Sequence, residues 1–278
     1  MTQLFSSADM ALARRIEAGH AHSAMFSTRD LAVAEMAGGW AIFHAIDSPV
    51  TQAIGVGMNG PVESGDLDRL EAFYHGRGSA AIIDLCTLAD ASVLGLIHER
   101  GYTVREISNV LVRRPDPEEQ FEIAPGVRVE PVTAHDYPAW ARLVVQGFAG
   151  IDEVPEEQVA MMTSTNPWPE TFFGFWDSAP GAGAAMDIHA GLATFFGDAT
   201  LVRARGHGLQ LALIRHRLQR AAQLECDLAT ASVVPGGTSH RNYERAGFQL
   251  VYGRVMLGRP LPGTEPSSTK NRAEGQRQ

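Results

Sequence analysis

The segment from Thr200 to Gln210 combines residue types that are suited to binding an anion. It contains two arginines and two glycines, and it lies between an expected strand and an expected helix. The glycines Gly206 and Gly208 let the backbone approach an anion closely. The free amides at the start of the helix point toward such a group, and the helix dipole favours negative charge. Arg205 adds a charge-assisted donor. The segment therefore predicts a binding site for phosphate groups.

Other nucleotide-binding and hydrolase motifs do not match the chain. A P-loop requires Gly-Lys followed by Ser or Thr, and a leucine follows Gly208. The Rossmann fingerprint requires three glycines at a fixed spacing, which this segment lacks. Ser239 has no Gly-x-Ser-x-Gly elbow around it, so the sequence does not predict a serine hydrolase.

Hydrophobic periodicity predicts the elements that position this segment. Leu209, Leu213 and Leu218 have helical spacing, and the arginines at 215, 217 and 220 are expected to project outward. Expected helices in the second half of the chain cover residues 133–148, 209–223 and 239–246, and expected strands cover 171–176, 185–196, 198–202, 227–233 and 250–257.

The first half of the chain shows a similar alternation of helices and strands. Both halves end in a helix, a glycine-aromatic pair (Tyr102 or Phe248) and an apolar strand. Two related α/β units are therefore expected, and chance likeness between two common α/β patterns is the alternative. Expected helices here cover residues 8–18, 66–75 and 92–100, and expected strands cover 40–45, 52–58, 80–85 and 106–113.

Prolines and acidic residues at 114–125 form a linker signature. The C-terminal stretch has no periodic apolar face, which is typical of a disordered tail. The expected organisation is one domain at 1–113, a linker at 114–125, a second domain at 126–258 and a tail at 259–278.

The phosphate-binding segment resembles the pyrophosphate loop of the GNAT superfamily of N-acetyltransferases, Arg/Gln-x-x-Gly-x-Gly/Ala. Arg203-x-x-Gly206-x-Gly208 matches literally, whereas Arg205-x-x-Gly208-x-Gln210 places the helix better and is preferred. Downstream, the run from Ser239 through Tyr243 to Phe248 is similar to a second GNAT motif.

The resemblance is specific over residues 185–257 and weaker over 126–184, and residues 1–113 resemble a degenerate second unit without the loop motif. It implies an α/β fold with a mixed (α+β) sheet. Two GNAT-like units are expected, each a mostly antiparallel twisted sheet flanked by helices.

The resemblance implies that acetyl-CoA is the co-substrate and lies in a gap between the strands at 198–202 and 227–233. Backbone groups near Thr200 and Val202 would pair with its pantetheine arm, and loop amides would hold its pyrophosphate. The cofactor-binding residues implied in this way are Thr200, Leu201, Val202, Arg205, Gly206, His207, Gly208, Leu209, Gln210 and Asn242.

By the same resemblance, Tyr243 would protonate the departing thiolate, and a phenol can supply that proton. The alternative is that Tyr243 only packs beneath the sheet. A substrate amine is mostly protonated at neutral pH, so a general base is also expected. Its candidates are Glu153, Glu170, His189 and Asp198, with His189 alternatively a core histidine and Asp198 alternatively a strand or turn residue; the sequence does not choose among them.

The composition narrows the class of protein. The chain has 278 residues, 45% of them hydrophobic, which is enough for a sizeable core. Its net charge of −9 argues against nucleic acid as a partner. No apolar run is long enough to span a membrane, and no signal peptide is predicted. Two widely separated cysteines, Cys86 and Cys226, and ten histidines without ligand spacing predict no metal site and a reducing, cytoplasmic location.

The charge distribution suggests the acceptor. No Lys or Arg occurs between Arg142 and Arg203, whereas that stretch holds the carboxylates of residues 152, 153, 156, 157, 170, 177, 187 and 198. Such a segment attracts cations, although a solvated acidic helix with loops would have the same composition. Trp168 and Glu170 on a proline-rich loop would suit a cationic ligand or simply form an ordered turn.

The expected acceptor is therefore a primary amine on a small cationic molecule, with an aminoglycoside-type antibiotic as the sharpest form of this hypothesis. Transfer to a protein or peptide amine, or a non-catalytic acyl-CoA sensor, are the alternatives. Neither a nucleic acid nor a membrane is expected as a partner, and homodimer formation stays open.

Overall fold

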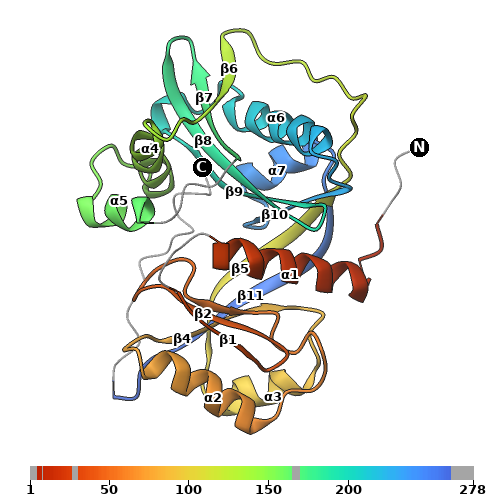
Figure 1. Cartoon of the computed structure of the whole chain (residues 1–278), viewed down its shortest axis with the longest axis vertical. Coiled ribbons are helices and arrows are strands. Elements are labelled where there is room, and N and C mark those ends of the chain that lie inside the picture. The colour runs from red at the N-terminus through yellow and green to blue at the C-terminus, as the bar shows by residue number, and fades with distance from the viewer. Residues whose placement is uncertain (1–4, 8, 27–30, 165–169, 264–278) are drawn as a thin grey trace. The chain divides into compact units, whose positions relative to one another are not determined.

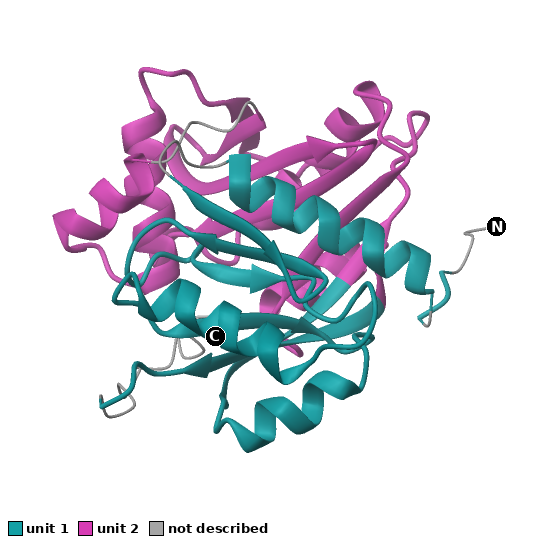
Figure 2. Ribbon diagram, turned by 60° about the horizontal axis from the view of Figure 1, so that its bottom comes forward, with its two compact units in different colours: residues 1–110, 251–269 teal, residues 111–250, 270–278 magenta. Residues whose placement is uncertain are grey.

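The computed structural model describes residues 5–7, 9–26, 31–164 and 170–263 (Figure 1). The chain divides into two compact units (Figure 2). Unit 1 comprises residues 1–110 and 251–269, and unit 2 comprises residues 111–250 and 270–278. The loop around Trp168 and most of the expected tail lie outside the described residues.

Unit 1 contains a mixed sheet in the order β1-β2-β3-β4-β11-β5. Its pairs β1–β2, β2–β3 and β4–β11 are antiparallel, and β3–β4 is parallel. The elements are α1 (Met10–Phe26), β1 (Ala32–Met36), β2 (Gly39–Phe43), β3 (Gln52–Ile54), α2 (Ser64–His75), β4 (Ala81–Cys86), α3 (Ser92–Glu99), β5 (Thr103–Arg113) and β11 (Gln249–Arg259).

Unit 2 contains strands in the order β10-β9-β8-β7-β6. The pair β9–β10 is parallel, and the other three pairs are antiparallel. The elements are β6 (Val127–Pro131), α4 (Tyr137–Ala149), α5 (Glu156–Thr163), β7 (Glu170–Trp176), β8 (Ala179–His189), β9 (Leu192–Thr200), a 3-10 turn at Val202–Ala204, α6 (Leu209–Gln223), β10 (Leu228–Val233) and α7 (Thr238–Arg245).

The two units repeat one order of elements. In each unit an antiparallel strand pair leads into a helix, then into a strand parallel to the preceding one, and then into a shorter helix. The members are β2-β3-α2-β4-α3 in unit 1 and β8-β9-α6-β10-α7 in unit 2. The expected fold class, two α/β units with mostly antiparallel mixed sheets, is confirmed.

The last strand of the chain belongs to unit 1. Residues 254–259 of β11 pair antiparallel with β4, from Arg254 opposite Cys86 to Arg259 opposite Ala81. The division into compact units thus differs from the expected domain limits, which placed residues up to 258 in the second domain. Apolar alternation identifies a strand, but it does not specify which sheet edge that strand joins.

Helical spacing of apolar residues builds the core of unit 1. The α2 side chains of Leu67, Leu70 and Tyr74 are fully buried against Ile83 and other residues of the sheet. The opposite face carries Ile42, which packs with residues of α1. Accordingly, α2 and α3 lie on one side of this sheet and α1 on the other (Figure 1).

The prediction of strands at 185–196 and 198–202 is wrong. Residues 179–200 form a hairpin of two long strands, β8 and β9, with a turn at Ala190 and Gly191. Both turn residues have positive φ, 47° and 76°. The apolar run continues through this turn, and an alanine at the left-handed position gives no signal for it.

Membrane-spanning helices and metal-ligand clusters are not found among the described residues. None of their helices has the length and hydrophobicity needed to cross a bilayer. Among the same residues, no group of three or more His, Cys, Asp and Glu side chains is arranged to hold a metal ion. Cys86 and Cys226 are both buried free thiols.

Charged residues are buried between α1 and the sheet of unit 1. The Arg254 Nε donates to Glu17 Oε1 at 2.8 Å and lies 3.8 Å from Asp84 Oδ2. All three side chains are at most 8% exposed. Burial raises the pKa of Asp84 to about 6, partly offset by the Arg254 charge. The folded protein therefore binds a proton at Asp84 more tightly than the unfolded chain does.

The raised pKa of Asp84 predicts a pH-dependent loss of stability. Well below pH 4 this carboxyl is protonated in both states, but as the pH rises toward 7 the unfolded chain loses the proton first. This difference costs the folded protein about 3 kcal/mol across that window. Thermal unfolding is measured from about pH 4 to pH 7. Over this range the native protein should lose more stability than an Asp84→Asn variant does. Parallel curves for the two proteins would contradict the prediction.

Candidate functional site

The parallel strands β9 and β10 pair over only part of their length. Their register runs from Leu192 opposite Leu228 to Phe195 opposite Ala231. Strand β9 continues to Thr200, and there it pairs with β8 alone, with Ala199 opposite Gly183. Within the described residues, the edge of residues 197–200 that faces away from β8 has no strand partner. A chain-like ligand can pair with such an edge.

A β-bulge lies at residues 197–198 of β9, where β9 pairs with β8 alone. Phe196 pairs with Ala185 and Ala199 pairs with Gly183, so Gly197 and Asp198 both lie opposite Ala184. Gly197 has φ +69°, which an L side chain rarely adopts. A bulge redirects the side chain that it contains. Here it places Asp198 beside a tyrosine of α7.

The loop that follows β9 presents a run of free backbone donors. The N–H groups of residues 206–211 donate to no backbone or side-chain acceptor among the described residues. Gly206 and Gly208 are solvent-exposed, and Gly208 is the N-cap of the 15-residue helix α6 with φ +78°. Free amides at a helix N-terminus form an anion site. The predicted phosphate loop therefore presents free backbone donors, and phosphate binding by these residues stays a prediction.

Side chains and one backbone bond hold this loop in place. The His207 ring stacks on Trp176 of β7 with a centroid distance of 3.4 Å and an interplanar angle of 17°. Arg205 donates from Nε to the Thr200 carbonyl at 3.4 Å. Leu201 donates its N–H to the Gly181 carbonyl at 2.9 Å, which attaches the start of the loop to β8. Val202 is exposed and belongs to the 3-10 turn.

Gln210 is where the resemblance departs from the usual Gly or Ala. Its side chain donates to Ser239 Oγ at 2.9 Å and accepts from Asn242 Nδ2 at 2.7 Å. Asn242 also accepts from Arg245 at 2.8 Å. Gln210 thus connects the first turn of α6 to α7. Asn242 was expected to bind the cofactor. Its side-chain amide makes these hydrogen bonds to Gln210 and Arg245, and its role toward a cofactor stays a prediction.

Tyr243 lies in a buried polar cluster with Asp198 and Arg217. It is 1% exposed and donates its hydroxyl proton to Asp198 Oδ2 at 2.8 Å. Arg217 is fully buried, bonds both oxygens of Asp198, and lies 3.4 Å from the Tyr243 hydroxyl. Burial raises the pKa of Tyr243 well above 10, despite the opposing effect of Arg217. The tyrosine therefore keeps its proton at neutral pH.

The expectation that Arg217 projects outward is wrong. It lies four residues after the buried Leu213 and four before the buried Ala221, so helical spacing puts it on the buried face. This helical spacing is the feature of the sequence from which the buried position of Arg217 could have been predicted. Arg220 also does not simply extend into solvent. Its guanidinium makes two hydrogen bonds to Glu170, at 2.9 and 2.8 Å.

The four candidate bases lie in different environments. Asp198 touches Tyr243, whereas both oxygens of Glu170 are held by Arg220. Glu153 is exposed in the loop before α5. His189 pairs with Leu192 at the opposite end of β9, six residues and about 20 Å from Asp198. The structure brings only Asp198 together with Tyr243.

Arginines outside the acidic stretch form ion pairs with four of its eight carboxylates. Asp152, Glu156, Glu170 and Asp198 form ion pairs with Arg203, Arg142, Arg220 and Arg217, respectively. The sequence shows no basic residue within the stretch, yet the fold supplies them from its flanks and from α6. Glu153 and Glu157 are exposed and have no ion pair among the described residues. Any attraction for cations therefore rests on fewer carboxylates than the sequence suggests.

Comparison with known proteins identifies the fold. No protein-family model and no curated protein matches the sequence. Among solved structures, a GCN5-related N-acetyltransferase from Kribbella flavida superposes with a TM-score of 0.69 at 20% identity, covering 91% of this chain and 96% of that one. A tandem GNAT protein from the clavulanic acid biosynthesis pathway, solved without acetyl-CoA, gives 0.54 at 12% identity and covers 94% and 98%.

A third structure, a GCN5-related N-acetyltransferase from Sphaerobacter thermophilus, gives a TM-score of 0.55 at 20% identity over 69% of this chain and 63% of that one. The chain therefore has the fold of the GNAT acetyltransferases, in the tandem form with two GNAT-like units. The resemblance seen in the sequence is confirmed at the level of the fold.

Proposed function

We propose that unit 2 is an acetyl-CoA-dependent N-acetyltransferase that acts on a primary amine of a small cationic molecule. One observation carries the proposal: the free N–H groups of residues 206–211 lie at the end of a strand whose outer edge is unpaired. That combination suits a ligand with a pyrophosphate and a chain-like arm. The GNAT fold of the chain supports the choice of acetyl-CoA as that ligand.

Acetyl-CoA supplies a thioester carbonyl that an amine can attack. The N–H groups of residues 206–211 hold its pyrophosphate, and the free edge of residues 197–200 aligns the arm that bears the thioester. A backbone N–H of residues 197–200 that points away from β8 would stabilise developing negative charge on the carbonyl oxygen, an effect typically worth about 3 kcal/mol.

Tyr243 is the proton donor for the departing thiolate. Its raised pKa keeps the phenol protonated at neutral pH. Arg217, 3.4 Å from the hydroxyl, stabilises the phenolate that remains after the proton has left. In the structure Asp198 accepts the hydroxyl proton, so the O–H bond turns from Asp198 toward the thiolate sulfur before the proton is transferred. Packing and proton donation are thus compatible roles for this one side chain, because its ring also packs edge-on against Phe248.

Replacing Tyr243 with phenylalanine tests this role. The variant keeps the ring packing but loses the proton donor, so kcat is expected to fall at least about 100-fold, the lower end of the range typical of general acid catalysis. Affinity for coenzyme A should stay unchanged. Tyr137→Phe, in the buried part of α4, is the matched control and should keep the native kcat. An unchanged kcat in the Tyr243 variant would show that this tyrosine only packs.

The acceptor is tested with acetyl-CoA and a panel of amines that includes aminoglycosides, polyamines and peptides. The exposed carboxylates of Glu153 and Glu157 support a cationic acceptor, and an aminoglycoside-type antibiotic is the specific form that we propose. Mass spectrometry should show the gain of one acetyl group on a small cationic amine. Acetylation of peptides alone would favour the protein acetyltransferase alternative. Coenzyme A binding without any acetylated product would favour the acyl-CoA sensor.

A further inference from the structure

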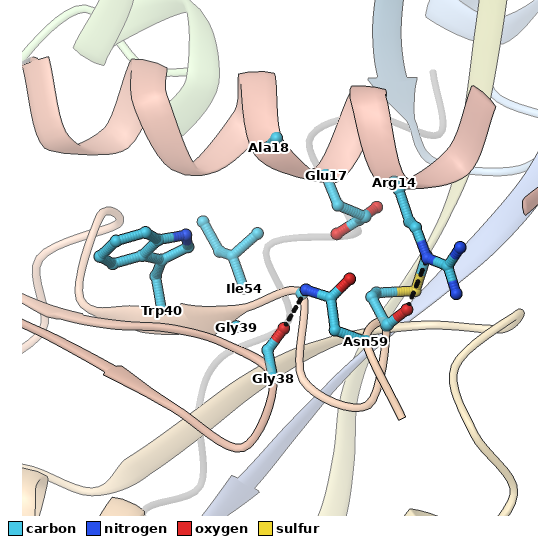
Figure 3. A pocket seen from close by; sticks show the side chains of 10 residues that line it. Arg14, Glu17, Ala18, Gly38, Gly39, Trp40, Ile54 and Asn59 are labelled. Atoms are coloured by element: carbon cyan, nitrogen blue, oxygen red, sulfur yellow. Dashed lines mark hydrogen bonds between the residues drawn. The ribbon is translucent and has the colours of Figure 1, made fainter. Parts of the chain in front are cut away.

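Unit 1 contains a cavity of about 240 Å³ beside helix α1 (Figure 3). Helix α1 contributes Glu17 and Ala18 to its lining, β2 contributes Trp40, and the turn after β3 contributes Asn59. The proposed acetyltransferase chemistry uses none of these residues. The cavity is thus a separate feature of unit 1.

Glu17 brings an incompletely bonded carboxylate to this cavity. The residue is 2% exposed, and its Oε1 accepts hydrogen bonds from the Tyr252 hydroxyl at 2.7 Å and from Arg254 Nε at 2.8 Å. Its buried Oε2 has no hydrogen-bond partner among the described residues. In Figure 3 the carboxylate extends from α1 toward the turn that carries Asn59. A buried acceptor without a donor is costly, so a ligand that donates there gains affinity.

The charges around Glu17 favour a positively charged donor. Glu17 and Asp84 share one guanidinium, that of Arg254. His20 Nδ1 lies 3.7 Å from Asp84, but burial and the Arg254 charge lower the pKa of His20 well below 6.5. At pH 7 the imidazole is therefore neutral, while Asp84, with a pKa of about 6, is mostly ionised. The buried cluster thus sets two carboxyl groups, Glu17 and Asp84, against the single guanidinium of Arg254.

The other lining residues suit an ammonium group with an apolar body. Trp40 and Ile54 give the cavity an aromatic and an aliphatic wall, and an aromatic ring also attracts a cation. Asn59 uses its amide nitrogen to bond the Gly38 carbonyl at 2.9 Å, which leaves its side-chain oxygen as an acceptor. Arg14 also lines the cavity, but it is exposed and its Nε is bound to the Met58 carbonyl at 2.8 Å.

We propose that this cavity binds a small primary ammonium compound, whose charged end donates to Glu17 Oε2 and whose apolar end packs against Trp40. The site is distinct from the acceptor site proposed for unit 2. It makes unit 1 a ligand-binding unit in its own right.

The test uses the full chain without acetyl-CoA and benzylammonium as the probe. Isothermal titration should show saturable binding of benzylammonium, and benzyl alcohol, its neutral counterpart, should bind at least about tenfold more weakly. Ala18 lines the cavity from an exposed position, so Ala18→Met should obstruct it and weaken benzylammonium binding at least about tenfold. Ala11→Met, also exposed on α1 but outside the cavity, is the matched control and should bind as the native protein does.

Three results would overturn the proposal. Equal binding of benzyl alcohol would remove the role of charge, and native affinity in the Ala18 variant would place the probe elsewhere. Saturable binding of coenzyme A that Ala18→Met abolishes, without binding of benzylammonium, would assign the cavity to another ligand. Glu17→Gln is a second variant, in which benzylammonium should lose its advantage over benzyl alcohol. If that variant fails to fold, the two alanine variants still decide the question, because neither alters the buried charges.

Discussion

Replacement of Gly208 with valine is expected to weaken coenzyme A binding at least about 100-fold, or about 2.7 kcal/mol. Gly208 has φ +78°, where a side chain strains the backbone, and a branched residue there would stand among the free amides of residues 206–211. A Cβ atom at this position would lie 3.7 Å from the Ala124 Cβ, an ordinary contact. Crowding against the rest of unit 2 is therefore not the cause, and the fold should persist.

Titration with coenzyme A measures the effect, and thermal unfolding measures its structural cost. Gly101→Val is the matched control, because Gly101 has φ +70° and open space around it but lies in unit 1. It introduces the same kind of backbone strain, about 1–2 kcal/mol. Coenzyme A should bind the control with native affinity. Native affinity in the Gly208 variant would show that this loop does not hold the cofactor.

The variant Arg217→Met is expected to lower the free energy of unfolding by about 3–5 kcal/mol. Arg217 is fully buried and bonds both oxygens of Asp198, whose side chain is 11% exposed, so its removal leaves that carboxylate with the Tyr243 hydroxyl as its one side-chain donor among the described residues. Methionine fills most of the lost volume, so the loss reports the uncompensated charge together with the hydrogen bonds from Arg217 to the carbonyls of Ala185 and Phe196. Chemical denaturation followed in unit 2 measures it.

A second substitution separates charge from packing. When Asp198→Asn is added to Arg217→Met, the buried charge is removed as well, and at least half of the lost stability should return. Arg215→Met makes the same change at another face of α6 and is the control, because Arg215 is half-buried and its hydrogen bond goes to the Glu122 carbonyl, at 2.7 Å. It should cost about 1 kcal/mol. A double variant as unstable as Arg217→Met alone would show that packing and the lost hydrogen bonds to the carbonyls dominate at this position.

Local patterns in the sequence predicted the helices more accurately than the strands. The expected helix at 209–223 coincides with α6, because apolar spacing, the preceding glycine and the absence of helix breakers all agree. Strands β1 and β6 and helix α5 were not expected. Two of these elements are five-residue strands with alternating exposure, and α5 buries only Val159. Their hydrophobic signal is too weak to exceed that of the surrounding loops.

One part of the candidate site could likewise be predicted from local sequence patterns, and the other part could not. Residues 206–211 could be predicted, because a strand, two glycines and a helix start are contiguous in the sequence. The cluster of Asp198, Arg217 and Tyr243 joins three elements, and its assembly depends on a bulge that Gly197 makes and on the depth at which α6 packs. Only the spacing of Arg217 within α6 pointed to it.

The return of the C-terminal strand to unit 1 has a consequence during synthesis on the ribosome. Residues 254–259 of β11 pair with β4, so β4 lacks this second partner until those residues have been translated. Unit 2 has all its strands earlier and can finish folding while unit 1 still exposes a sheet edge, the kind of surface that promotes aggregation. A nascent chain that stalls or ends before residue 254 would therefore be a substrate for chaperones or proteases, even though its phosphate loop is complete.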